Sequence, residues 1–177
     1  ERAVTAARAS FPEFSATTIA DRAKLLRKIA GLYKERSARI AAVVTKEMGA
    51  PRQMAENFQG AMVVRQFEDM AAALEDFPFA VREGSAWIMR EPIGVCALIT
   101  PWNAPVWQIA TKIAPALAAG CTMVLKPSEL APFSALLFAE ILHDAGVPAG
   151  VVNLVNGDGA TVGAALASHP DVDMISI

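Results

Sequence analysis

The chain has 177 residues, of which 54% are hydrophobic and 19% charged, and its formal net charge is −2. No apolar run reaches the roughly 18 residues that a membrane-spanning helix needs, and no basic stripe offers a surface to nucleic-acid phosphates. Both cysteines lie in apolar, strand-like segments, and the N-terminus lacks the charged-then-apolar layout of a signal peptide. We therefore expect reduced thiols and a cytoplasmic protein without membrane or nucleic-acid partners.

Residues 1 to about 80 follow a helical hydrophobic period. A first helix is expected from the start of the chain, and a second follows a Thr17 or Thr18 cap and ends at Gly49-Ala50-Pro51. A third helix is expected over about 52–74. The apolar side chains expected to be buried on these three helices are Ala3, Val4, Ala7, Phe11, Leu25, Leu26, Ile29, Leu32, Ile40, Val43, Val44, Met54, Phe58, Met62, Val63 and Phe67.

From Trp87 onward, short apolar runs alternate with helices. We expect strands at 95–100, 123–126, 151–155 and 173–177, and helices at about 107–119, 132–145 and 161–168. Such a pattern indicates a parallel sheet that helices cover on both faces, with right-handed crossovers. The predicted fold class is α/β, with an N-terminal helical part (1–85) followed by a Rossmann-like parallel sheet (86–177). The sheet is expected to be incomplete, and residues 87–90 are expected to form a strand outside it.

The first strand ends in a polar elbow, Thr100-Pro101-Trp102-Asn103, where a parallel sheet places its ligands. Pro101 ends the strand, because it lacks a backbone donor. Asn103 has two interpretations. It caps the following helix, or its amide donates to a developing oxyanion. Trp102 either lines a ligand cleft or packs on the sheet.

A second elbow, Lys126-Pro127-Ser128-Glu129, follows the next strand. Lys126 and Glu129 could together hold the two hydroxyls of a ribose, as an acidic residue does in dinucleotide-binding folds. Alternatively, Ser128 and Glu129 are only turn and capping residues. The pairing of this elbow with the first one on a neighbouring strand favours a nucleotide site.

A third turn, Asn156-Gly157-Asp158-Gly159, followed by Gly163, is one residue longer than the dinucleotide fingerprint. It fits a plain strand-to-helix turn equally well. Cys96 and Cys121 are expected to be inert core thiols. His143 and His169 lack partners at metal-ligand or triad spacing, so we expect surface or capping roles for them and no metal site.

Taken together, five segments in this order and spacing resemble the aldehyde dehydrogenase superfamily over essentially the whole chain. They are EPIGV (91–95), ITPWN (99–103), APALAAGCT (114–122), VLKPSE (124–129) and GVPAGVVNLV (146–155). The resemblance implies an NAD-dependent oxidation of an aldehyde to a carboxylic acid through a thioester. It also implies a homodimer or homotetramer.

By the same resemblance, Asn103 corresponds to the oxyanion-stabilising Asn. Lys126, Ser128 and Glu129 correspond to the contacts with the adenosine ribose. The wall of the cofactor cleft corresponds to Ile99, Thr100, Pro101 and Trp102, and the helix beside the adenine corresponds to Gly159 and Gly163. Glu129 implies NAD over NADP, because a carboxylate repels a 2′-phosphate.

Family members continue into a Gly-Ser-Thr segment, a general-base Glu and a nucleophilic Cys, none of which this sequence contains. We therefore expect a segment of a longer enzyme that is inactive by itself. The alternative is a complete, non-catalytic module that binds a nucleotide or mediates oligomerisation.

Overall fold

A four-stranded parallel sheet organises the structure, a computed structural model that describes residues 1–177. The strands are β3 (Val95–Ile99), β4 (Thr122–Lys126), β5 (Val152–Leu154) and β6 (Met174–Ser176). They lie in the order β5-β4-β3-β6, and every neighbouring pair is parallel. The predicted α/β class and all four predicted strands are confirmed, with ends that differ by at most one residue.

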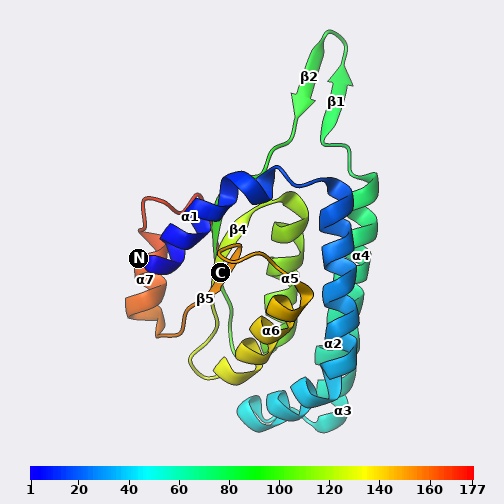
Figure 1. The fold of residues 1–177 in the computed structure, drawn as a ribbon. Coiled ribbons are helices and arrows are strands. Elements are labelled where there is room, and N and C mark those ends of the chain that lie inside the picture. Colours follow the sequence, from blue (N-terminus) through cyan, green and yellow to red (C-terminus); the bar gives the residue numbers. More distant parts are fainter.

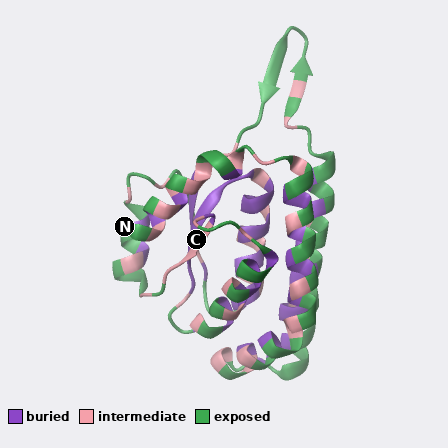
Figure 2. Cartoon of the chain, in the orientation of Figure 1, coloured by how far each residue is buried: buried purple, intermediate pink, exposed green.

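Helices cover both faces of this sheet (Figure 1). One face packs against α5 (Pro105–Ala119) and α6 (Pro132–Ala145), with α2 (Ile19–Met48) and α4 (Met62–Asp76) beyond them. The other face packs against α1 (Arg2–Ser15) and α7 (Ala164–Ala167), which follows the π-helical turn η2 (Gly159–Gly163). Alternate residues of β3 divide between the two sides. Cys96 and Leu98 join the larger core, whereas Val95 and Ala97 join the smaller one. The buried residues therefore run through the sheet and α5 (Figure 2).

The third predicted helix is interrupted by a π-helical segment. It consists of α3 (Arg52–Met54), η1 (Ala55–Ala61) and α4, so the chain gains a wider turn between its two α-helical parts. The change of period alters which residues face the core. Met54 and Met62, predicted to be buried, are 48% and 44% exposed, whereas Gln59 and Gly60 are buried. On α1 the ring that enters the core is Phe14, and Phe11 is only partly buried.

Residues 87–90 belong to a two-stranded antiparallel hairpin, β1 (Ala80–Glu83) and β2 (Ala86–Met89). The hairpin projects from the body of the molecule (Figure 1) and is mostly exposed (Figure 2). The predicted division between residues 85 and 86 falls inside this hairpin, at the start of β2. Helix α1 packs on the sheet through Val4 and Ala7, and its Phe14 joins the larger core. None of the helices combines the length and apolar character that crossing a bilayer requires.

The start of β3 is joined to α1 and β6 through one carboxylate. Asp173 Oδ2 accepts hydrogen bonds from the Val95 N–H at 2.7 Å and from Arg8 Nη2 at 2.7 Å. Gly94, directly before β3, has φ +126°, and a Cβ added there would overlap the Asp173 carboxylate. The junction therefore needs glycine at position 94 for both its backbone conformation and its space.

We predict that Gly94→Ala lowers the free energy of unfolding by about 1–3 kcal/mol, because the side chain adds backbone strain and displaces Asp173. Chemical denaturation measures the change. The control is Gly31→Ala in α2, where a Cβ has nothing within 4 Å, and it is expected to stabilise the protein by about 0.5–1 kcal/mol. Equal stability of wild type and Gly94→Ala would contradict the prediction.

Candidate functional site

The two polar elbows lie side by side at the carboxyl edge of the sheet. Ile99 of β3 pairs with Lys126 of β4 in the parallel register. One residue further on, the Thr100 N–H donates to the Lys126 carbonyl at 3.1 Å. The predicted pairing of the elbows is confirmed, so residues 100–103 and 126–129 follow neighbouring strands at the same edge of the sheet.

The first elbow presents an exposed amide that forms no hydrogen bond. Helix α5 begins at Pro105. Its N-cap residue, Ala104, has no side chain that can accept a hydrogen bond from the helix. Asn103 is exposed one position earlier, so the interpretation of Asn103 as the N-cap is wrong. Trp102 is 49% exposed and does not pack into the sheet. Thr100, by contrast, is buried, and its hydroxyl has no hydrogen-bond partner.

Helices α5 and α6 are capped by side chains that are distant in the sequence. Gln59 Oε1 accepts from the Trp107 N–H at 3.1 Å in the first turn of α5. The Glu47 carboxylate accepts from the Phe133 N–H at 2.9 Å and from the Ser134 N–H at 3.2 Å in the first turn of α6. Both helices start with Ala-Pro, which supplies no capping oxygen, and both are completed from the N-terminal helices.

Neither remote cap is predicted by the sequence. The available signal is the missing local cap before Pro105 and Pro132, which indicates that a cap is needed without saying where it comes from. The capping alternative for Ser128 and Glu129 is wrong, because the N-cap residue of α6 is Ala131 and Glu47 supplies the acceptor. Ser128 does have a turn role, since its Oγ accepts from the Leu130 N–H at 3.2 Å.

The second elbow contains a buried cation. The Lys126 side chain is only 2% exposed, and its Nζ donates to the Pro127 carbonyl at 3.0 Å. Nζ also lies 3.4 Å from Glu129 Oε2, on a carboxylate that is half exposed. The pKa of Glu129 lies below its usual range, because its own backbone N–H and then the Lys126 charge favour the ionised form.

The third turn (156–159), with Gly163 after it, lies against Ile99 and Lys126. Gly163 is buried, and a Cβ added there would lie 3.8 Å from Ile99 Cδ1 and 3.9 Å from Lys126 Cε. Asp158 caps η2 by accepting from the Thr161 N–H at 2.6 Å, and this bond lowers the pKa of Asp158, with a further contribution from Lys126. Gly159 is exposed, with open space around it. One ammonium group thus acts on carboxylates from two different turns.

The remaining candidate groups lie away from this cluster. Cys96 and Cys121 are free and buried in the larger core. His169 accepts from the Asp171 N–H at 3.1 Å in a turn, and His143 is exposed at the end of α6. Nowhere do three or more His, Cys, Asp or Glu side chains gather as they would around a metal ion.

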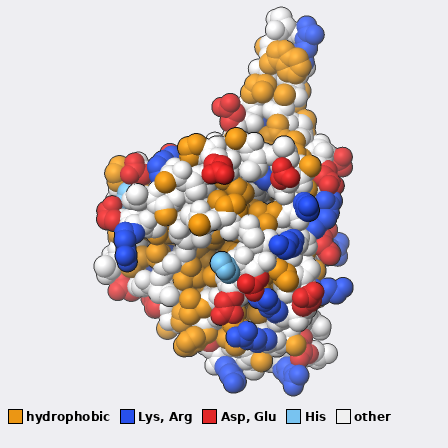
Figure 3. All heavy atoms as spheres, viewed as in Figure 1, with side chains coloured by type: hydrophobic (Ala, Val, Ile, Leu, Met, Phe, Trp, Pro, Cys, Tyr) orange, Lys and Arg blue, Asp and Glu red, His pale blue; other side chains and the backbone are white.

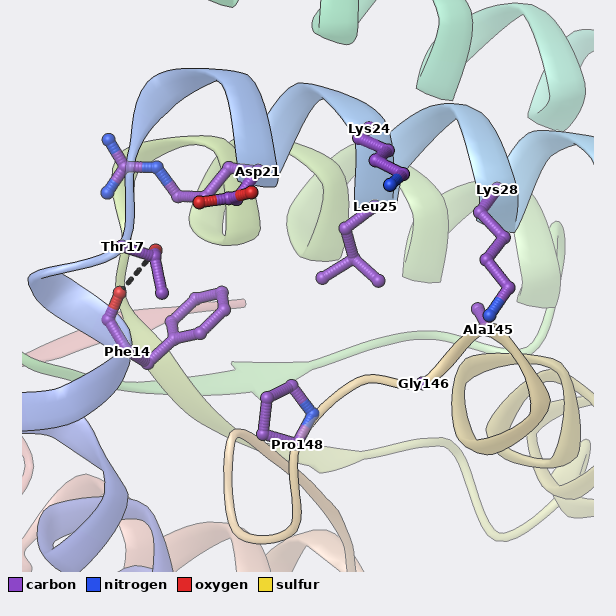
Figure 4. A pocket seen from close by; sticks show the side chains of 10 residues that line it. Phe14, Thr17, Asp21, Lys24, Leu25, Lys28, Ala145, Gly146 and Pro148 are labelled. Carbon is purple, nitrogen blue, oxygen red and sulfur yellow. Dashed lines mark hydrogen bonds between the residues drawn. The ribbon is translucent and has the colours of Figure 1, made fainter.

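A separate pocket lies between the α1–α2 turn, the beginning of α2 and the loop after α6 (Figure 4). Lys24, Leu25 and Lys28 line it from α2, and Gly146 and Pro148 line it from the loop. It contains none of the predicted site residues. Its lysines are surface residues, so the chemistry of the strand-end cluster is not repeated there.

Comparison with known proteins identifies one family. The model of the aldehyde dehydrogenase family matches residues 1–177. A 3-succinoylsemialdehyde-pyridine dehydrogenase from a Pseudomonas species is 52% identical over 175 residues, covering 98% of this chain and 37% of the relative. A putative aldehyde dehydrogenase from Staphylococcus haemolyticus is 47% identical over 176 residues, covering 99% of this chain and 37% of the relative.

Solved structures of aldehyde dehydrogenases are also similar to this chain. A mutant of aldehyde dehydrogenase C from Pseudomonas syringae, in complex with NAD+ and octanal, superposes with a TM-score of 0.98 at 53% identity. That match covers 99% of this chain and 36% of the other. A betaine aldehyde dehydrogenase variant from Staphylococcus aureus, in complex with NAD+, superposes with a TM-score of 0.94 at 34% identity, covering 98% and 37%. The chain thus spans little more than a third of the length of the proteins that it matches.

Proposed function

Because the chain belongs to the aldehyde dehydrogenase family, we propose that it forms the cofactor-binding part of a longer NAD-dependent enzyme. That enzyme oxidises an aldehyde to a carboxylic acid through a thioester. The observation that carries the proposal is the meeting of the two elbows at the carboxyl edge of β3 and β4, with a buried lysine beside an exposed carboxylate. Dinucleotide-binding folds use this edge of the sheet for their ligand.

The residues of the cluster fit NAD. Glu129 and Lys126, with Ser128 beside them, present an acceptor and a donor to the adenosine ribose. The cleft wall is formed by Ile99, Thr100, Pro101 and Trp102, where the buried Thr100 hydroxyl has no protein partner and Trp102 is half exposed. Gly159 and Gly163 lie beside the adenine. Bound NAD would accept the hydride from the aldehyde carbon.

Asn103 is the one catalytic residue that we assign to this chain. Its exposed side-chain amide forms no hydrogen bond within the protein, so it is free to donate to the oxygen of a tetrahedral adduct. The nucleophilic thiol and the general base are not assigned here. Both cysteines are buried in the core, and the Glu47 carboxylate is bound to the N-terminus of α6.

The β1–β2 hairpin supports assembly into a homodimer or homotetramer in the whole enzyme. Trp87 and Met89 are 62% and 63% exposed, and apolar side chains lie along the projecting hairpin in Figure 3. Large exposed apolar groups of this kind favour burial against another subunit. We further propose that the enzyme is cytoplasmic and that a small aldehyde and NAD are its ligands.

We expect residues 1–177 alone to produce no NADH from NAD and octanal, because they supply neither the thiol nor the base. Absorbance at 340 nm measures the product, with the full-length enzyme as the positive control. Sustained turnover by the segment would overturn both the proposed division of the active site and the assignment of Cys96 and Cys121 as core residues.

In the full-length enzyme, Asn103→Ala should lower kcat on the order of 10²-fold, because the oxyanion loses a donor in the transition state. Steady-state kinetics measure the effect. Asn153→Ala is the matched control. It removes two bonds to the Met123 and Gly150 carbonyls and is expected to lower thermal stability while kcat is retained. A wild-type kcat in Asn103→Ala would contradict the oxyanion role.

Glu129→Gln should weaken NAD binding and reduce the preference for NAD over NADP, because the neutral amide has one acceptor oxygen for the ribose instead of two and no longer repels a 2′-phosphate. Binding titrations with both cofactors measure the change. Glu140→Gln on the exposed surface of α6, where the carboxylate faces Arg39, is the control and should leave both affinities unaltered. If Glu129→Gln does the same, Glu129 does not contact the ribose.

A further inference from the structure

The start of α5 constrains the backbone that carries the Asn103 amide. Asn103 is separated from the helix only by Ala104, and its own side chain forms no hydrogen bond that would hold it. Its place therefore depends on the backbone on either side. Before it, the Thr100 N–H is bonded to the Lys126 carbonyl, which fixes the end of β3. On the other side of Asn103, the first turn of α5 also has to be held in place.

Gln59 supplies that second constraint. With Ala104 as N-cap and Pro105 in the first helical position, Trp107 occupies the third, whose N–H is the usual partner of a capping side chain. Gln59 Oε1 accepts this N–H at 3.1 Å. The ring of the neighbouring Phe58 packs on Trp107, with the ring centroids 5.4 Å apart.

Gln59 is itself held firmly. Its side chain is 1% exposed, and its backbone carbonyl accepts from the buried Tyr33 hydroxyl of α2 at 2.6 Å. The π-helical segment η1 turns this residue toward α5 instead of toward solvent. The position of the cap is therefore set by packing of α2 and η1 and not by the elbow.

Only the oxygen of the Gln59 side-chain amide forms a hydrogen bond. Oε1 is engaged by Trp107, and the buried Nε2 has no hydrogen-bond partner. An apolar residue of the same size would avoid the unpaired donor but would leave the Trp107 N–H without an acceptor. The group required at this position is thus the carbonyl oxygen.

We propose that Gln59 is a positioning residue for the reaction, which holds Asn103 in place by capping α5 from the N-terminal helices. This inference rests on the proposed oxyanion role of Asn103. Gln59 does not contact the reacting atoms, and it acts through the first turn of α5. Its loss should affect the step that needs the oxyanion donor more than the binding of NAD.

The test uses the full-length enzyme with octanal and NAD. Gln59→Met keeps the length of the side chain and removes the acceptor, and it should lower kcat about 10-fold, since misplacement of a reacting group by 1 Å can cost about 10²-fold. The KM for NAD should stay within about twofold of the wild-type value. Gln59→Glu keeps an acceptor oxygen for Trp107 and should recover most of kcat.

Glu47→Ala is the matched control, because it removes the remote cap of α6, which follows the ribose elbow and not Asn103. Its effect should fall on the KM for NAD, with kcat retained. If Gln59→Met and Glu47→Ala lower kcat equally, loss of a cap acts only through general destabilisation, and the positioning role is overturned.

A double-mutant cycle separates this inference from the oxyanion role. In an Asn103→Ala background, Gln59→Met should cause no further loss of kcat, and independent, multiplicative losses would overturn the inference. An Asn103→Ala enzyme with a wild-type kcat would instead overturn the oxyanion role itself. If Gln59→Met does not fold, Tyr33→Phe, which removes only the bond to the Gln59 carbonyl, is judged by the same two criteria.

Discussion

Two hydrogen-bonding side chains from the N-terminal helices complete the helices that follow the elbows. The first turn of an α-helix leaves backbone N–H groups without partners inside the helix. Neither Ala104 nor Ala131 has a side chain that can accept them. Gln59 and Glu47 do so from a distance, at the starts of α5 and α6. The geometry of each elbow is consequently tied to α2 and η1, which are remote from the sheet in the sequence.

The N-terminal part of the chain therefore has a second structural role, the capping of α5 and α6. Its helices do more than cover one face of the sheet, because the end of α2 and the π-helical segment reach the starts of α6 and α5, the helices that follow the two elbows. The π-helical segment is essential to this, since its wider turn buries Gln59 and leaves Met54 and Met62 exposed. A regular helix would follow the apolar pattern and present a different face to α5.

Electrostatics concentrate at the same edge of the sheet. A buried ammonium group is costly unless it is hydrogen-bonded or paired, and Lys126 has the Pro127 carbonyl and Glu129 beside it. Its charge favours ionisation of both Glu129 and Asp158, which come from different turns. The second and third turns thereby share one buried positive charge, with two carboxylates at the surface above it.

The sequence by itself determined the elements and their class, because hydrophobic period and Pro/Gly punctuation are local properties. It therefore predicted the four strands, the helices between them and the meeting of Thr100–Asn103 with Lys126–Glu129, since consecutive parallel strands end at the same edge. The tertiary structure decided how the helix starts are satisfied. Asn103 is the local candidate for the cap of α5, but the acceptor for the Trp107 N–H is Gln59, which lies 48 residues before Trp107 in the sequence. The partner of 87–90 and the burial of Lys126 were likewise decided by packing. Contacts between distant segments leave no periodic signal in the sequence, so only the folded chain shows which side chain reaches which backbone group.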